Sequence, residues 1–295
     1  MGEKKRWGDR KDGVLLRDLD SMHFITPLLY PNRCDNEAYV SQRVELTQLD
    51  EYIASKNAAQ PEVPYTMFHA IVAATMRAIT LRPKMNRFIA NKNMYLRNEL
   101  TASFVVKKQF KDSGAEALAF LHTAPEDTMD TLHDKIAAQI LSGRSEKADA
   151  STESMDLFNK MPRFLSKFLV AIVRRLDVHG WVPRSLIASD PYYSTVVFSN
   201  VGSIGLQSGY HHLTNWGTNS IFMLIGKADV TPVYQPDGSF RMVRTVDLGL
   251  TVDERLADGY YYSKTVRLLR FLVDNPEYLE RPLSEPVDYE QKAVV

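Results

Sequence analysis

The chain of 295 residues has a single cysteine, Cys34, and no excess of either charge, with 36 basic and 36 acidic residues. One cysteine excludes an intramolecular disulfide. A balanced charge gives no general attraction to nucleic acid, to an anionic membrane or to an acidic partner. The N-terminal sequence MGEKKRWGDRKDG is charged, and no apolar run of the kind found in a secretory signal follows it. These absences predict a cytoplasmic protein whose partner is a small molecule or another copy of itself.

Long hydrophobic runs are also absent. The longest apolar stretch, 164–176, is interrupted by serine, lysine and arginine residues. It falls far short of the roughly 20 apolar residues that a membrane-spanning helix needs. The sequence also lacks a Gly-x-Ser-x-Gly elbow, a phosphate-cradling glycine loop and a dinucleotide-binding fingerprint. It therefore predicts no membrane span and gives no support to a hydrolase, a kinase or a dehydrogenase.

The hydropathy pattern that is present predicts one α/β domain with a mixed sheet. The segment 65–83 is alanine-rich and apolar on most sides, which is typical of a central buried helix. The sequence Pro-Asp-Gly at 236–238 predicts a hairpin turn. Helices are predicted over 47–56, 65–83, 128–143, 161–186 and 259–279, and strands over 38–46, 91–98, 99–110, 194–200, 220–230 and 240–256, with 91–98 and 99–110 paired.

Four segments describe the predicted organisation. Residues 1–20 are mostly charged and are expected to form a surface arm, remote from catalysis. The domain itself spans 21–280, and 281–295 is a polar tail. An insertion over 145–190 contains the amphipathic helix. This helix has cations beside its apolar face, so it is either a membrane-surface or lid helix or, as we favour at this point, a helix packed on its own domain with its basic face in water.

Three motifs carry a resemblance. Residues 198–205 read FSNVGSIG, residues 215–226 read NWGTNSIFMLIG, and residues 253–259 read DERLADG. In order and spacing they resemble the catalytic domain of the 2-oxoacid dehydrogenase acyltransferases and chloramphenicol acetyltransferase. Together with the block 25–107, the likeness covers most of the chain. The lipoyl-bearing and peripheral-subunit-binding segments of a complete dehydrogenase component are missing, and the insertion and the segment 210–213 depart from the family. The resemblance therefore implies a divergent, stand-alone branch of that family.

The resemblance implies a chloramphenicol-acetyltransferase-like two-layer sandwich that forms a homotrimer with its sites between subunits. It also implies acyl transfer to or from a thiol such as coenzyme A, which would be a substrate rather than a tightly bound cofactor. The alternative is a catalytically inactive trimeric binding or scaffolding protein, a pseudoenzyme. A histidine or a high-pKa carboxylate facing Ser199 across the interface would distinguish the two.

Glu254 stands where the family has the histidine that removes a proton from the thiol. Imidazole suits this task near neutral pH. A glutamate of pKa about 4.3 is roughly four units too weak for a thiol of pKa about 8.5, unless burial raises its pKa. Glu254 is therefore either the base or a residue that pairs with a cation across the interface and does no chemistry.

The family's motif aspartate pairs with an arginine and fixes the active-site loop. Asp258 occupies this position, and Arg33 lies near the position of the arginine. The resemblance therefore implies a buried Arg33–Asp258 ion pair. The alternative is a plain surface arginine after a Pro-Asn turn.

Ser199 resembles the hydroxyl that stabilises the tetrahedral oxyanion in these acyltransferases, with Asn200 beside it as a substrate-binding residue. A serine at the end of a strand also commonly bonds the following turn. Thr214 and Asn215 lie near further polar residues of the family's site, although a structural role in the loop is the favoured interpretation.

His211 and His212 are adjacent histidines in a loop that the family places near its site. One of them is a candidate for a displaced catalytic base. The commoner arrangement is one packed and one solvated histidine. Neighbouring side chains seldom converge on a metal, and no other ligand lies at suitable spacing, so we predict no metal site.

Overall fold

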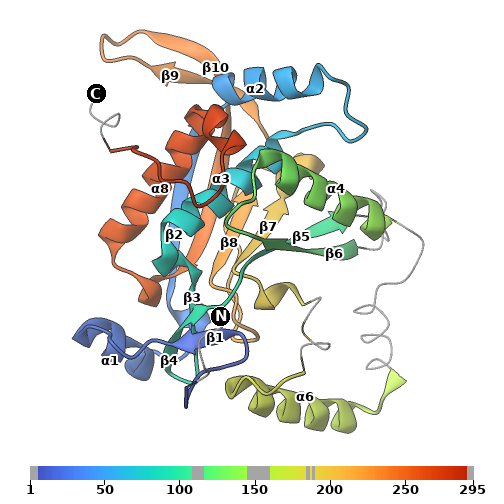
Figure 1. Ribbon diagram of the computed structural model, residues 1–295, viewed down its shortest axis with the longest axis vertical. Helices are drawn as coiled ribbons and strands as arrows, with labels where there is room; N and C mark the ends of the chain where they lie inside the picture. The colour runs from blue at the N-terminus through green and yellow to red at the C-terminus, as the bar shows by residue number, and fades with distance from the viewer. Residues whose placement is uncertain (1–5, 108–115, 145–159, 184–186, 188–189, 291–295) are drawn as a thin grey trace.

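The computed structural model describes residues 6–107, 116–144, 160–183, 187 and 190–290. Its centre is a seven-stranded mixed sheet, in the order β2-β10-β8-β7-β5-β6 with β9 paired to β10 (Figure 1). Neighbours β5, β7 and β8 run parallel, and the other pairs are antiparallel. The strands are β2 (Glu37–Glu45), β5 (Leu100–Lys107), β6 (Glu116–Thr123), β7 (Val196–Asn200), β8 (Ile221–Ile225), β9 (Asp229–Tyr234) and β10 (Phe240–Asp253).

Helices cover one face of this sheet (Figure 1). They are α2 (Thr47–Asn57), α3 (Met67–Leu81), α4 (Met129–Arg144) and α8 (Gly259–Asp274). As predicted, α3 is central, and its residues from His69 to Ile79 are all buried. Its alanines allow the sheet and the neighbouring helices to approach closely, which forms the main hydrophobic core.

The opposite face of the sheet is crossed by the loop that follows β7. A Cβ added to Gly249 in β10 would lie 1.8 Å from the carbonyl oxygen of Gly209. Only glycine leaves room for this contact. Beside the loop, a small apolar cluster joins Val197, Leu213 and Phe222 to Leu224. This face of the sheet carries Ser199.

Two predicted features of the strands have different outcomes. The hairpin is confirmed, because Gly238 has a φ of 84° and β9 pairs with β10 around it. The pairing of 91–98 with 99–110 is wrong. Strand β4 (Asn93–Arg97) pairs with β1 (Gly13–Leu15) and β3 (Arg87–Ala90) in a small second sheet. The chain bends after β4, so that β5 enters the large sheet instead.

The expectation of a surface arm is wrong for part of residues 1–20. Besides the strand β1, the guanidinium group of Arg10 is buried. Its Nε donates to Asp12 at 2.8 Å, and its Nη2 lies 3.7 Å from an Asp177 oxygen. The charge of Arg10 is therefore balanced by these acidic partners instead of being solvated by water. Residues 1–5 lie outside the described residues.

Two further helices lie at the lower end of the view in Figure 1. They are α1 (Ser21–Leu29) and α6 (Arg163–Val178), the helix predicted within the insertion. The other parts of the insertion, 145–159, 184–186 and 188–189, lie outside the described residues. In the part of the chain that the structure describes, no helix is long and apolar enough to cross a membrane.

Candidate functional site

The motif DERLADG begins at the end of β10 and turns into α8. Asp253 is fully buried and accepts hydrogen bonds from Arg255, at 2.7 Å from Nε and 2.6 Å from Nη2. Its other buried neighbour is Arg33, whose Nε lies 3.9 Å from an Asp253 oxygen. Burial lowers the pKa of Arg33, and the charge of Asp253 opposes this shift. One carboxylate thus lies between two buried guanidinium groups.

Arg33 also fixes the loop before β8. Its Nη1 donates to the carbonyl of Thr214 at 2.6 Å, and its backbone N–H donates to Oδ1 of Asn215 at 2.7 Å. The hydroxyl of Thr214 donates to the carbonyl of Trp216 at 2.8 Å. The structure therefore brings together Arg33, Thr214 and Asn215 from the predicted set, in contacts that fix the loop.

The implied ion pair between Arg33 and Asp258 is absent, and this prediction is wrong. Asp258 is exposed and caps α8, accepting the backbone N–H of Tyr261 at 2.9 Å. That hydrogen bond lowers the pKa of Asp258. Arg33 points instead to Asp253, which is buried at the end of β10. The structural aspartate is thus the first residue of the motif, and Asp258 has a local role.

The capping role predicts a small effect of substitutions at Asp258. Asparagine caps a helix about as well as aspartate, whereas alanine at this position typically costs about 1 kcal/mol. We therefore expect Asp258→Asn to stay within about 0.5 kcal/mol of the parent and Asp258→Ala to lose about 1 kcal/mol. Urea denaturation measures both. A loss near 4 kcal/mol for Asp258→Asn would instead indicate a buried ion pair.

Glu254 is exposed and lies in a 3₁₀ turn over 254–256. Its backbone N–H donates to the carbonyl of Asn36 at 2.9 Å. Its carboxylate has no hydrogen bond or ion pair with any residue that the structure describes. Its neighbour Arg255 points inward. A carboxylate in this position is available to a substrate or to a second chain.

Ser199 lies in β7, half-buried, opposite Leu224 of β8. The bond to the following turn comes from Asn200, whose Oδ1 accepts the backbone N–H of Ser203 at 3.3 Å. The hydroxyl of Ser199 forms no hydrogen bond with the described part of the chain. It is therefore free to donate to a ligand.

The two histidines of the loop differ in their surroundings. The ring of His211 stacks on Phe222, with 4.1 Å between the ring centroids, and its Nδ1 lies 2.9 Å from the carbonyl oxygen of His212. His212 is exposed. This arrangement fits the interpretation of one packed and one solvated histidine. Among the described residues, no three His, Cys, Asp or Glu side chains form a group that could hold a metal ion.

The strand register separates Ser199 from Glu254. Ser199 is level with Leu224, whereas Val252 is level with Ile221 and Glu254 lies beyond it. Strands rise about 3.3 Å per residue and lie about 4.8 Å apart, which puts the two residues roughly 15 to 20 Å apart. One chain therefore does not bring the two side chains together.

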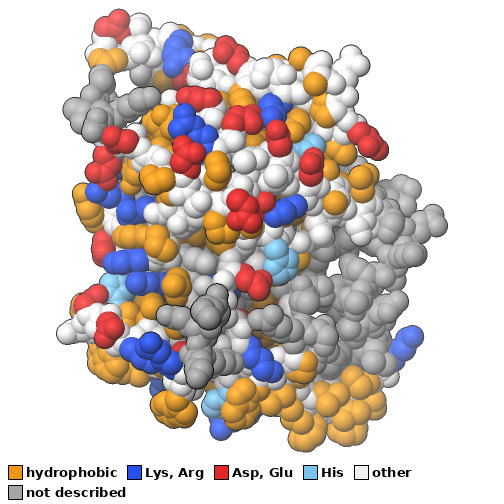
Figure 2. Space-filling view, viewed as in Figure 1, with side chains coloured by type: hydrophobic (Ala, Val, Ile, Leu, Met, Phe, Trp, Pro, Cys, Tyr) orange, Lys and Arg blue, Asp and Glu red, His pale blue; other side chains and the backbone are white. Residues whose placement is uncertain are grey.

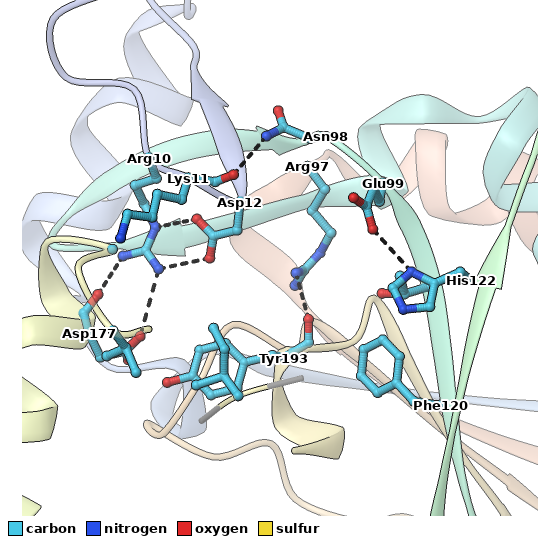
Figure 3. Close-up of a pocket in the computed structure, with 14 residues that line it drawn as sticks. Arg10, Lys11, Asp12, Arg97, Asn98, Glu99, Phe120, His122, Asp177 and Tyr193 are labelled. Atoms are coloured by element: carbon cyan, nitrogen blue, oxygen red, sulfur yellow. Dashed lines mark hydrogen bonds and ion pairs between the residues drawn. The ribbon is translucent and has the colours of Figure 1, made fainter. Parts of the chain in front are cut away.

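A pocket of about 160 Å³ was not predicted (Figure 3). Its lining includes Arg97, Phe120, His122 and Tyr193. Nη1 of Arg97 donates to the carbonyl of Tyr193 at 3.1 Å, and burial lowers the pKa of Arg97 to about 9. The lining residues are distant in the sequence and form no motif. Because Tyr193 precedes β7, this pocket lies at the other end of that strand from Ser199.

The comparisons with known proteins give the fold. No protein-family model and no curated protein sequence matches the chain. Among solved structures, a probable dihydrolipoamide acetyltransferase from Listeria monocytogenes 4b F2365 matches with a TM-score of 0.58 and 14% identity, covering 89% of this chain and 95% of that one. Chloramphenicol acetyltransferase matches with a TM-score of 0.55 and 13% identity, covering 89% and 98%. The chain has the chloramphenicol-acetyltransferase-like fold.

Further structures with this fold extend the comparison. The cubic core of the pyruvate dehydrogenase multienzyme complex has a TM-score of 0.59 at 13% identity, with 90% of this chain and 93% of that chain covered. The Azotobacter vinelandii dihydrolipoamide acetyltransferase has the same values, and roles of a serine, a histidine and an asparagine in its catalytic mechanism have been investigated. At these identities the likeness establishes the chloramphenicol-acetyltransferase-like fold and nothing further. This is the fold that the three motifs predicted.

Proposed function

We propose that this protein transfers an acyl group to or from a thiol such as coenzyme A, at a site formed between the subunits of a homotrimer. Ser199 of one subunit would face Glu254 of the next. The observation that carries this proposal is their separation within one chain, by roughly 15 to 20 Å of sheet. Both side chains are without hydrogen-bonding partners in the described chain, and a second copy could bring each of them to the other.

The surface beside Glu254 supports contact with another subunit. The motif turn is joined to the end of α1, because Nη1 of Arg255 donates to the carbonyl of Tyr30 at 2.6 Å. Helix α1 exposes several large apolar side chains. Among them, Met22, Phe24 and Leu29 are exposed by 69%, 62% and 63%. Large apolar side chains exposed in this way are typical of a protein interface.

In the proposed reaction Glu254 transfers the proton and Ser199 stabilises the oxyanion. Glu254 accepts the proton of the attacking thiol, and the sulfur forms a bond to the acyl carbonyl carbon. The hydroxyl of Ser199 donates a hydrogen bond to the oxyanion that develops. Collapse of the tetrahedral intermediate breaks the bond to the departing thiolate, which recovers the proton from Glu254. Because a carboxylate is a weak base for a thiol, we expect the transfer to be slow.

A second candidate function is a trimeric binding or scaffolding protein without activity. The exposed position of Glu254 favours this candidate, because burial is one of the ways in which a carboxylate becomes a stronger base. Both candidates need the same trimer. They differ only in whether the parent protein transfers acyl groups.

The trimer has a direct test. Sedimentation at micromolar concentration is expected to give three chains of 33.6 kDa, about 100 kDa in all. Replacement of Phe24 and Leu29 by serine on α1 should lower this mass. A stable monomer of the parent would contradict both the trimer and the shared site.

The activity is tested by acetyl exchange between acetyl coenzyme A and a dithiol. We expect slow exchange that falls by about 10² to 10³ in Ser199→Ala, since one oxyanion donor is lost. The control is Ser203→Ala, which removes a hydroxyl four residues away that bonds the carbonyl of Asn200 at 2.6 Å. Equal rates in the parent and in both variants would contradict the role of Ser199.

A further inference from the structure

Helix α6 exposes an apolar surface that the described part of the chain does not cover. None of its 16 residues is buried. Phe164 and Phe168 are exposed by 76% and 62%. A surface helix of a globular domain normally buries its apolar side against the core. This helix packs on its own domain less fully than the sequence led us to expect.

The apolar arc of α6 is wider than its contact with the domain. Leu165, Leu169 and Leu176 are half-buried and lie on one side of the helix. The exposed side chains Phe164, Phe168 and Ile172 follow at intervals of four residues, which places them in one stripe beside that side. We call these three residues the apolar stripe. Packing on the domain does not account for the stripe.

Cations lie next to the apolar stripe. Arg163, Lys167, Arg174 and Arg175 are all exposed, and within the part of the chain that the structure describes no ion pair joins any of them to an acid. The acid of the helix, Asp177, faces inward, and its Oδ1 lies 3.7 Å from Nη2 of Arg10. The outward side of α6 is therefore apolar and positively charged, and among the described residues no acidic side chain pairs with its cations.

An exposed tryptophan follows the end of the helix. Trp181 is exposed by 62% and stacks on His179 with 4.8 Å between ring centroids. Exposed tryptophan is favoured where an apolar phase meets water. Figure 2 shows hydrophobic side chains gathered over α6 along the lower edge of the molecule. These side chains lie at one end of the molecule, where a flat surface can contact them.

We propose that α6 docks on the surface of an anionic lipid bilayer. The apolar stripe would enter the boundary between headgroups and acyl chains, and the neighbouring cations would reach the lipid phosphates. Charge complementarity selects this occupant. A second copy of the chain would bring the same cations against one another, whereas lipid phosphates neutralise them. The proposal concerns a different element from the acyl-transfer site and stands without it.

The test is flotation of the full-length protein with vesicles. Vesicles of phosphatidylcholine mixed with phosphatidylglycerol are expected to carry the protein, and phosphatidylcholine alone much less. Phe164→Ser with Phe168→Ser should lower the partition coefficient at least about tenfold. On the mixed vesicles, Lys167→Gln with Arg174→Gln should lower the partition coefficient about fivefold for each charge removed. On phosphatidylcholine alone, the same variant should bind like the parent. Added salt should weaken the parent's binding.

Matched controls lie elsewhere on the surface. Phe240→Ser alters a phenylalanine exposed by 59% in the β9–β10 hairpin, at the opposite end of the molecule in Figure 1. Arg267→Gln with Arg270→Gln removes two exposed cations of α8. Both controls should bind vesicles like the parent. Binding that is equal on both vesicle types, or unchanged in the α6 variants, would overturn the proposal. A fall in sedimenting mass of the lipid-free α6 variant would overturn it too, because the stripe would then contact another copy.

Discussion

Replacing Asp253 by asparagine is expected to lower the free energy of unfolding by about 3 to 5 kcal/mol. Asp253 is fully buried between Arg33 and Arg255 and is hydrogen-bonded to the second. The substitution preserves the shape of the side chain but leaves two buried guanidinium groups without a counter-charge. Breaking a buried pair in this way is much more costly than breaking an exposed one. The midpoint of urea denaturation measures the loss.

An aspartate on the same strand provides the control. Asp247 also pairs with an arginine, at 2.7 Å from Nε of Arg43, but both side chains are partly in water. Asp247→Asn should cost less than about 1 kcal/mol. Adding Arg255→Gln to Asp253→Asn should recover part of the loss, since one uncompensated charge is removed. A loss below 1 kcal/mol for Asp253→Asn would show that the cluster is solvated or differently paired.

The sequence predicted the local elements well because their signals are local. The alanine-rich segment that forms α3 and the Pro-Asp-Gly turn before β10 need only their own residues to be recognised. The three motifs predicted the fold, because their order follows the order of the strands and turns that build it. The overall architecture and the position of the motif turn could therefore be predicted from the sequence.

The pairing of buried charges could not be predicted from the sequence. A family position suggested Asp258 as the partner of Arg33, but β10 carries Asp253 into the interior and leaves Asp258 at the surface. Arg10 in the charged arm is buried for the same kind of reason, since its partner Asp177 is distant in the sequence. A charged residue is expected at the surface unless its partner is known. Only the folded chain identifies such partners.

The candidate site was predicted as a set of residues rather than as an arrangement. Arg33, Thr214 and Asn215 do meet, in contacts that hold the loop before β8. Ser199 and Glu254 do not meet within one chain, because the strand register keeps them apart. Hydropathy patterns and motif spacing carry no information on which residues of two copies meet.

The largest gain in activity is expected from Glu254→His. A carboxylic acid is about four pKa units more acidic than a thiol, and each unit of mismatch corresponds to about 1.36 kcal/mol of proton-transfer driving force. Imidazole recovers roughly half of that difference, so the acetyl exchange rate should rise by about 10². Glu254 is exposed and has no side-chain partner in the described chain, so the substitution removes no stabilising contact.

The controls separate the possible bases. Glu254→Gln has the size of glutamate without its basicity and should not exchange acetyl groups above background. Ser199→Ala in the Glu254→His protein should remove most of the gain, since both residues would act on one intermediate. If the parent is active and Glu254→Gln abolishes that activity, glutamate is the working base and its environment must raise its pKa.

The remaining alternative is that one of the two loop histidines is the catalytic base. If His211→Ala or His212→Ala alone abolishes a parental activity, the base lies in that loop and the assignment of Glu254 is wrong. The packed ring of His211 on Phe222 makes His212, which is exposed, the better candidate for such a role. A last possibility is that neither the parent nor Glu254→His exchanges acetyl groups while the trimer persists. The protein is then a binding or scaffolding member of this fold, because an imidazole at an intact site should restore the chemistry.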